Sequence, residues 1–297
     1  TAPDGITLNA SNINTADGAA NPNITFTGPV IVSGDVTVSA DNTTNDGAIE
    51  FTSTIDGAAS GNNDLTVLSG AGTLTFTGDI GVTTALRDFT VNNSDTGTGD
   101  TAAISIANIG DTGGGASDNA GARTVTLGST DTTSVTLSGT YYRTDGDLTI
   151  TTASGAGAID FTGAAPTITT SGDAVEFVGG SILLANGSDL TINTNISDAS
   201  GAGGNITVAG RIVGTSDEDL TLTTGTAGST GDVSVHQIGG EISTIAIRGN
   251  GKIKLDGDIA TSAESGAGEA APSLTLTGAV ELQSSITITT DSGGTDG

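Results

Sequence analysis

The stretch Leu74-Thr75-Phe76-Thr77-Gly78-Asp79 carries the pattern that decides the fold. Apolar and polar residues alternate over its first four positions and a Gly-Asp pair follows, which is typical of a short, half-buried strand that ends in a turn. The phrase returns along the chain at Ile24-Thr25-Phe26-Thr27-Gly28, Ile49-Glu50-Phe51-Thr52, Leu148-Thr149-Ile150, Ile159-Asp160-Phe161-Thr162-Gly163, Leu274-Thr275-Leu276-Thr277-Gly278 and Ile286-Thr287-Ile288-Thr289. The chain is therefore predicted to be a ladder of short strands.

The spacing of these phrases favours a solenoid over separate globular units. They recur roughly every 10 to 16 residues, with pairs near 25, and a single short rung cannot bury its apolar side unless another rung stacks on it. We predict an all-β fold, a parallel β-helix (β-solenoid) rod of roughly a dozen turns with about 25 residues per turn, in which residues 1–297 form one continuous solenoid. The alternative is several small immunoglobulin-like sandwiches, whose strands recur at similar intervals. The lack of Trp and the presence of only six Phe favour the narrow solenoid core.

The composition restricts the classes of function. The 297 residues include 34 acids and only seven Lys or Arg, for a net charge of -27, so binding to nucleic acid or to an anionic membrane surface is disfavoured. The absence of Cys excludes disulfides, thiol nucleophiles and zinc fingers. No stretch has the length of apolar residues that a membrane span needs. Because the chain begins with Thr1, we expect a processed chain or a segment of a longer repeat protein.

Acidic turns are the densest candidates for a binding site. The cluster Asp217-Glu218-Asp219 could offer oxygen ligands to Ca²⁺, and we assign it as the candidate calcium site. Other carboxylates recur in turns, at Gly-Asp corners that include Asp35, Asp79, Asp111, Asp147, Asp173, Asp232 and Asp258. The chain lacks an EF-hand loop and calcium-binding nonapeptide repeats. The alternative is that Gly and Asp both favour turns, with each Asp side chain bonding to nearby backbone N–H groups.

We predict no enzymatic activity and assign no catalytic residue. Glu50, Asp160 and Glu176 lie inside predicted strands, but their side chains would point to solvent, whereas glycoside hydrolysis needs two carboxylates facing one bond. The lone histidine, His236, has no second His or Cys with which to bind a transition metal. No nucleophile triad and no phosphate-binding loop occurs. We predict no required cofactor; a calcium ion at the acidic turn is the one candidate ligand.

Threonines at solvent-facing strand positions raise one further hypothesis, which is ice binding. It would need uninterrupted Thr rows on one flat surface, and the β-branched preference of strands explains the same residues without a ligand. The candidates are Thr25, Thr37, Thr75, Thr149, Thr275 and Thr287.

The segment 47–92 resembles the repeat unit of filamentous-haemagglutinin-like and related giant bacterial surface proteins. The likeness lies in Ile55-Asp56-Gly57, in Phe76-Thr77-Gly78-Asp79-Ile80-Gly81 and in Leu86-Arg87-Asp88-Phe89-Thr90-Val91-Asn92. It recurs more weakly at 157–163 and 272–290. The resemblance implies a right-handed parallel β-helix, export to the cell surface and a role in adhesion, matrix or fibre building.

These observations lead to the prediction of an extracellular structural protein on the bacterial surface or in a biofilm matrix. We expect it to self-associate head to tail into a filament, stalk or fibre, with its own copies as the main partner. The alternative is an adhesin rod that binds a glycan or a host surface, for which Tyr141-Tyr142 would be the aromatic contact. A polysaccharide-active enzyme and an ice-binding protein are weaker alternatives.

Overall fold

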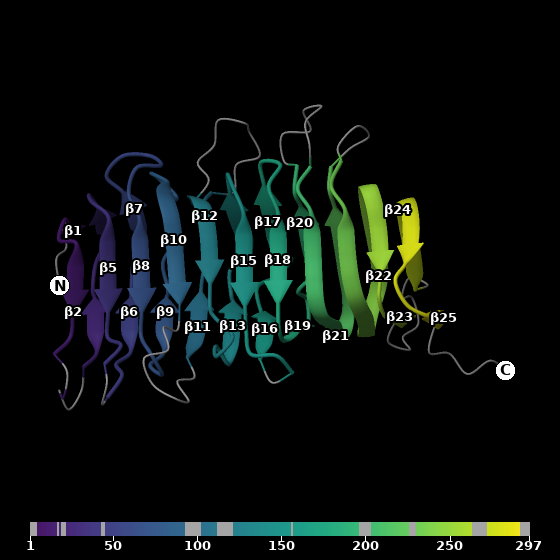
Figure 1. The fold of residues 1–297 in the computed structure, drawn as a ribbon, viewed down its shortest axis with the longest axis horizontal. Coiled ribbons are helices and arrows are strands. Elements are labelled where there is room, and N and C mark those ends of the chain that lie inside the picture. The colour runs from purple at the N-terminus through teal and green to yellow at the C-terminus, as the bar shows by residue number, and fades with distance from the viewer. Residues whose placement is uncertain are drawn as a thin grey trace.

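The protein is an all-β rod in which the chain winds around one long axis (Figure 1). The computed structural model describes residues 5–16, 18, 22–42, 45–92, 102–111, 121–155, 157–195, 203–225, 230–262 and 272–291. Within these ranges there is no helix of the length and apolarity needed to cross a membrane.

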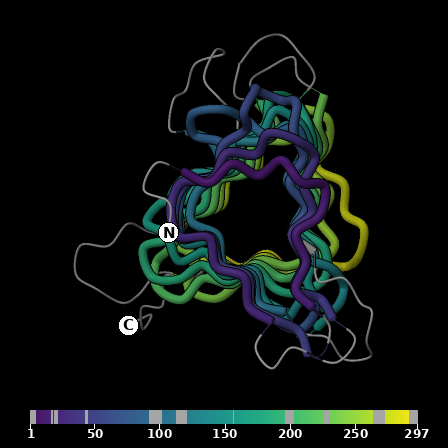
Figure 2. The backbone as a smooth tube through the Cα atoms, turned by 90° about the vertical axis from the view of Figure 1, so that its left-hand side faces the viewer, coloured from purple at the N-terminus to yellow at the C-terminus, as the bar shows by residue number. Residues whose placement is uncertain are grey.

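Each turn of the chain lays strands on three sides of the rod, which has a roughly triangular cross-section (Figure 2). Side A contains β1 (Ile6–Leu8), β4 (Val30–Val32), β7 (Ile55–Gly57), β14 (Tyr141–Thr144), β17 (Thr167–Thr170) and β20 (Leu190–Asn193). Side B contains β2 (Asn12–Asn14), β5 (Val36–Ser39), β8 (Leu65–Leu68), β10 (Leu86–Asn92), β12 (Ala122–Leu127), β15 (Leu148–Thr151) and β18 (Val175–Val178). Side C contains β3 (Ile24–Phe26), β6 (Ile49–Phe51), β9 (Leu74–Phe76), β11 (Ala103–Ile106), β13 (Ser134–Leu137), β16 (Ala158–Phe161), β19 (Ser181–Leu184), β23 (Ile259–Ser262) and β25 (Ile288–Asp291).

Three long strands bend around the corners and contribute to more than one side. They are β21 (Ile206–Thr223), β22 (Val233–Leu255) and β24 (Ser273–Leu282). Side A continues through 219–223, 244–248 and 273–277, because these segments pair with one another in parallel. The end of β24, residues 279–282, instead pairs with the end of β22 on side B.

The strands stack in parallel and in register, as the alternating pattern predicts. On side C, for example, Thr25 lies beside Glu50 and Glu50 lies beside Thr75. About nine turns have strands on all three sides, and two further turns have a single bridge on side A, at Ile80 and at Ile109. The parallel β-solenoid is therefore confirmed.

The turns differ in length more than the sequence pattern indicates. Hydrogen bonds between successive turns join residues 25 apart near the N-terminus, as between Ala48 and Asn23, but 33 apart between Tyr141 and Asn108. Such longer turns reduce the number that the chain can form, so the expected dozen is not reached with strands on every side.

One apolar core fills the interior of the rod. Side chains at alternate strand positions point inward, and Phe26, Phe51 and Phe76 form a column on side C. The ring centroids are 4.6 Å apart between the first two and 5.2 Å between the next two, with interplanar angles of 15° and 8°. In-register stacking of the repeated phrase places each ring above the same ring of the previous turn. Burial and stacking therefore follow directly from the repeat.

Two corner features show why Gly and Thr recur between strands. A Cβ atom on Gly72 would lie 2.1 Å from the carbonyl oxygen of Gly47, so this corner accepts only glycine while adjacent turns stay this close. At the corner that follows side A, buried hydroxyls of Thr170 and Thr194 donate to the carbonyls of Asp173 and Gly204, at 2.6 and 2.7 Å. These bonds satisfy polar groups that would otherwise be buried without partners.

Candidate functional site

The predicted calcium ligand Glu218 lies at the corner where β21 passes from side C to side A. Its side chain is fully buried, and its carboxylate accepts hydrogen bonds from Thr215 N at 2.7 Å and from Ser216 N at 2.8 Å. The hydroxyl of Thr215 donates to the same carboxylate at 3.2 Å. Asp217, the residue before it, has a positive φ of 55°. The carboxylate of Glu218 thus holds the backbone of its own turn.

The third predicted ligand, Asp219, bonds to the adjacent turn. Its Oδ1 accepts from Thr244 N at 3.1 Å and from the Ser243 hydroxyl at 3.2 Å. In the part of the chain that the structure describes, no three His, Asp or Glu side chains form a group that could hold a metal ion. The calcium site at 217–219 stays a prediction.

Asp219 belongs to a ladder of Asp and Asn side chains at the corners of the rod. In each case a side-chain oxygen of one turn accepts the backbone N–H of a residue in the following turn. The bonds join Asn23 to Ala48, Asp35 to Asp64, Asp46 to Ala71, Asp56 to Thr83 and Thr84, Asp64 to Asp88, Asn108 to Thr140, Asp147 to Ala174, Asp189 to Asp219, Asn205 to Asp232, Asp219 to Thr244, Asp232 to Lys252 and Asp258 to Thr287, at 2.7 to 3.2 Å. We call this set the corner ladder.

The corner ladder gives many acids of this chain a structural role. A backbone N–H at a corner has no strand carbonyl opposite it, so a carboxylate or amide oxygen of the neighbouring turn accepts its hydrogen bond. The preference of Asp for tight turns explains why Asp occurs at the corners. The hydrogen bonds, however, join successive windings of the rod and not residues that are close in sequence. Asp79 differs, because it accepts from Asn108 Nδ2 at 2.8 Å and from the Tyr141 hydroxyl at 3.0 Å.

Basic side chains lie along the corner ladder and neutralise part of its charge. Arg87 pairs with both Asp35 and Asp64, and Lys254 pairs with Asp232 at 2.6 Å. The hydrogen bond from Lys254 lowers the pKa of Asp232 below its usual range, and the bond to Asp64 raises the pKa of Arg87. The Tyr141 hydroxyl is partly buried and bonds to Asp79, which together raise its pKa to about 12. These contacts hold the stacked turns together at their corners.

The three strand carboxylates considered for catalysis lie on different parts of the rod. Glu50 is on β6 and Asp160 on β16, both on side C, whereas Glu176 is on β18 on side B. Four rungs separate Glu50 from Asp160, or about 19 Å at the usual strand spacing. Two carboxylates that act on one glycosidic bond lie about 5 to 10 Å apart. The structure does not bring this pair together.

Asp160 is expected to destabilise the fold at neutral pH. It is stacked between Thr136 and Leu183, and this burial raises the pKa of its carboxyl. Because the pKa of this carboxyl is higher in the folded state, the protonated side chain costs no stability below the unfolded pKa. As the pH rises through the folded pKa, the carboxylate ionises and the fold loses stability. We expect Asp160→Asn to raise the urea midpoint at pH 7 and to leave it unchanged at pH 3. Glu176→Gln, at an exposed outward position, is the control and should leave the midpoint unchanged at both pH values; an unchanged Asp160→Asn midpoint at pH 7 would contradict the prediction.

His236 is half exposed on the outside of the rod. Its Nδ1 lies 3.6 Å from the Asp256 carboxylate, which is also half exposed. A pair of this kind at the surface contributes little to stability.

The threonines considered for ice binding do not share one surface. Thr25 and Thr75 are on side C, Thr37 and Thr149 on side B, and Thr275 on side A. The strand register instead brings other threonines together in one row, which the sequence could not predict because it does not tell which turns stack. It runs along five successive turns of side B and contains Thr37, Thr66, Thr90, Thr126 and Thr149, after which Glu176 interrupts it.

The last described turn exposes residues that are buried in the other turns. Val280 and Leu282 on β24 stack on Ile253 and Leu255, whose side chains are fully buried. Val280, Leu282 and Ile288 are nevertheless 46%, 58% and 47% exposed, because within the described residues no further turn lies over them. They are the large apolar side chains that the described part of the rod leaves in water.

The fold places this chain among the parallel β-solenoids, proteins in which one structural unit stacks on its neighbours. No protein-family model, curated protein or solved structure matches it.

Proposed function

We propose that the protein is a structural β-solenoid that self-associates head to tail into a filament, stalk or matrix fibre outside the bacterial cell. The observation that supports this most is the exposed apolar row at Val280, Leu282 and Ile288. Apolar surface in water costs roughly 25 cal/mol per Å², and a further turn of the same shape would bury it.

The first turn of a second copy has the pattern that such a joint needs. Its inward positions are apolar and partly or fully buried, at Ile6, Leu8, Ile13, Ile24 and Phe26. A parallel strand added to the outer edge of β24 and β25 would continue the ladder and pair its backbone groups. Continuing a parallel ladder requires both copies to point the same way, so the contact is head to tail. Such a contact does not close on itself and builds a filament.

We further propose that the solenoid winds in a right-handed sense, that the protein is exported, and that it belongs to a family of bacterial surface proteins. A right-handed winding follows the strong preference of parallel crossovers for that hand. The repeat phrases at 47–92 support membership of the filamentous-haemagglutinin-like surface proteins, and with it an extracellular location. The net charge of -27 keeps the lateral surfaces of separate rods apart until cations screen it.

The test is electron microscopy and sedimentation of the purified chain across a concentration series, at low and at physiological salt. We expect rods that join end to end, with longer particles at higher concentration and higher salt. The variant Leu282→Glu places a charge in the joint and should leave single rods.

The control is Ala279→Glu, which adds the same charge to the same strand. Ala279 points outward beside Lys252, so its side chain lies outside the joint, and this variant should assemble like the unmodified chain. A chain that stays monomeric at every concentration, or a Leu282→Glu variant that assembles normally, would overturn the proposal.

A further inference from the structure

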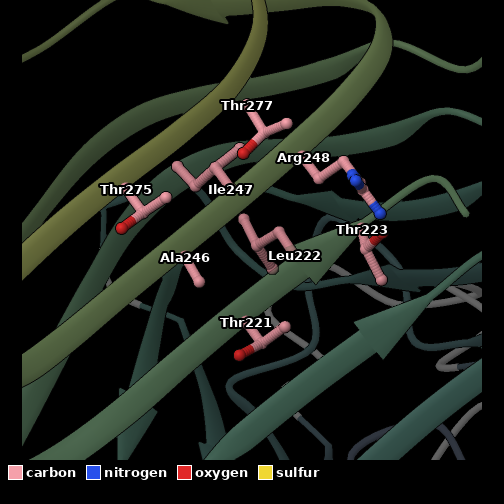
Figure 3. A pocket seen from close by; sticks show the side chains of 8 residues that line it. All are labelled: Thr221, Leu222, Thr223, Ala246, Ile247, Arg248, Thr275 and Thr277. Carbon is pink, nitrogen blue, oxygen red and sulfur yellow. The ribbon is translucent and has the colours of Figure 1, made fainter. Parts of the chain in front are cut away.

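A shallow groove crosses three turns of side A near the C-terminal end of the rod (Figure 3). Its volume is about 300 Å³, at the small end of the range for ligand pockets. Two outward rows line it. Thr221, Ala246 and Thr275 form one row, and Thr223, Arg248 and Thr277 form the other.

The hollow has a simple cause in the sequence. Ala246 stands where the turns before and after it carry threonine, so its short side chain leaves a gap between Thr221 and Thr275. In the neighbouring row, Arg248 replaces the corresponding threonine, and its guanidinium reaches toward Thr223 (Figure 3). Leu222 and Ile247 point into the core beneath and hold this surface in place.

Arg248 is unusual among the basic residues of this acidic chain. Five of the seven pair with carboxylates: Arg87, Arg123, Arg143, Lys252 and Lys254. Arg248 is exposed and makes no ion pair with any residue that the structure describes, and the same holds for Arg211. An arginine that has no carboxylate partner among the described residues is available to a ligand that supplies one.

We infer that this groove binds a hydroxylated carboxylate, such as one uronic acid unit of an acidic polysaccharide. The guanidinium of Arg248 would hold the carboxylate through two parallel hydrogen bonds. The hydroxyls of Thr221, Thr223, Thr275 and Thr277 can both donate to and accept from the hydroxyls of the sugar. A single guanidinium suits one negative charge better than a phosphate group of nearly two, which the surrounding acids would repel more strongly.

The outward rows continue on side A beyond the groove. Thr191 and Asn193 on β20, and Thr167 and Thr169 on β17, stack under the same two rows. Hydroxyl and amide groups therefore line a track at about 4.8 Å per turn. Such a track fits an extended polyhydroxylated chain, with Arg248 binding one acidic unit. The inference does not depend on self-association, since the groove lies on the side of the rod.

The test is calorimetric titration of the full chain with a trisaccharide that carries one galacturonate unit between two neutral sugars. We expect Arg248→Gln to weaken binding at least tenfold, and Ala246→Leu, which fills the hollow but keeps the arginine, to weaken it similarly. Arg211→Gln is the matched control, because it removes the same charge from another exposed arginine and should leave the affinity unchanged. Circular dichroism checks that each variant is folded.

Two further probes separate the parts of the inference. Maltotriose, which has hydroxyls but no charge, and acetate, which has a carboxylate but no hydroxyls, should each bind at least tenfold more weakly than the galacturonate. No binding of galacturonate, equal losses in Arg248→Gln and Arg211→Gln, or acetate binding as tightly as the sugar would overturn the inference.

Discussion

Replacing Phe51 with alanine is expected to lower the free energy of unfolding by about 3–5 kcal/mol. Phe51 is fully buried and stacks between Phe26 and Phe76, so the change removes the centre of the column and leaves a cavity with a ring on each side. The expected loss comes from the transfer free energy of the ring and from this cavity, which adjacent rungs cannot close without leaving their register. Urea denaturation measures the total loss.

Amide hydrogen exchange shows where the loss occurs, because each turn of a solenoid contacts only its neighbours. Exchange should accelerate most in β3, β6 and β9. The control on the same strand is Glu50→Thr, which gives the outward position the residue found at Thr25 and Thr75 and should change stability by less than about 0.5 kcal/mol. A Phe51→Ala variant within 1 kcal/mol of the unmodified chain would show that the aromatic column does not support the rod.

The interior of the rod could be predicted from the sequence because a strand has a period of two. In Leu74-Thr75-Phe76 the alternation alone separates the two buried residues from the outward-facing, partly buried threonine, and the structure confirms this division. Repetition of the phrase also predicts that the same residue type stacks in successive turns, as Phe26, Phe51 and Phe76 do. Burial depends on the alternation within one strand, and stacking depends on the same phrase returning in the next turn, so both can be predicted from the repeat.

The corners could not be predicted in the same way. The partner of a corner aspartate depends on the length of the turn that follows, and this varies between 20 residues at Asp232 and 30 at Asp189. The groove at Arg248 arises from three turns stacked in one register, which no single phrase encodes. Residue type indicated that acids lie in turns, but only the register shows which backbone groups they bind.

In the acidic turn 217–219, the residue types indicate one role and the hydrogen bonds indicate another. Three consecutive acids indicate a cation site by composition, whereas the buried carboxylate of Glu218 accepts its hydrogen bonds from Thr215 and Ser216. The same residues therefore support two roles that an experiment can separate: one stabilises the corner without a metal ion, and the other requires one.

We expect Glu218→Gln to lower the free energy of unfolding by about 1–3 kcal/mol, with or without calcium. Glutamine keeps the shape of the side chain, but its NH₂ group would face backbone N–H donors in place of a second carboxylate oxygen. The remaining oxygen can accept from Thr215 N and Ser216 N, which both donate to Oε2, but the NH₂ group then faces the Ser216 N–H that lies 3.0 Å from Oε1. The negative charge that strengthens these bonds is also lost. Thermal and urea unfolding in millimolar Ca²⁺ and in EDTA measure the loss.

Asp217→Asn is the matched control for the metal. Asn tolerates the positive φ of 55° at this position, so the variant removes one carboxylate while keeping the backbone. If the corner is held by hydrogen bonds alone, Ca²⁺ leaves the midpoint of the unmodified chain unchanged, and Glu218→Gln loses the same stability with and without the ion. If 217–219 is a calcium site, Ca²⁺ raises that midpoint, and both variants abolish the rise, because each removes a ligand charge that the ion requires.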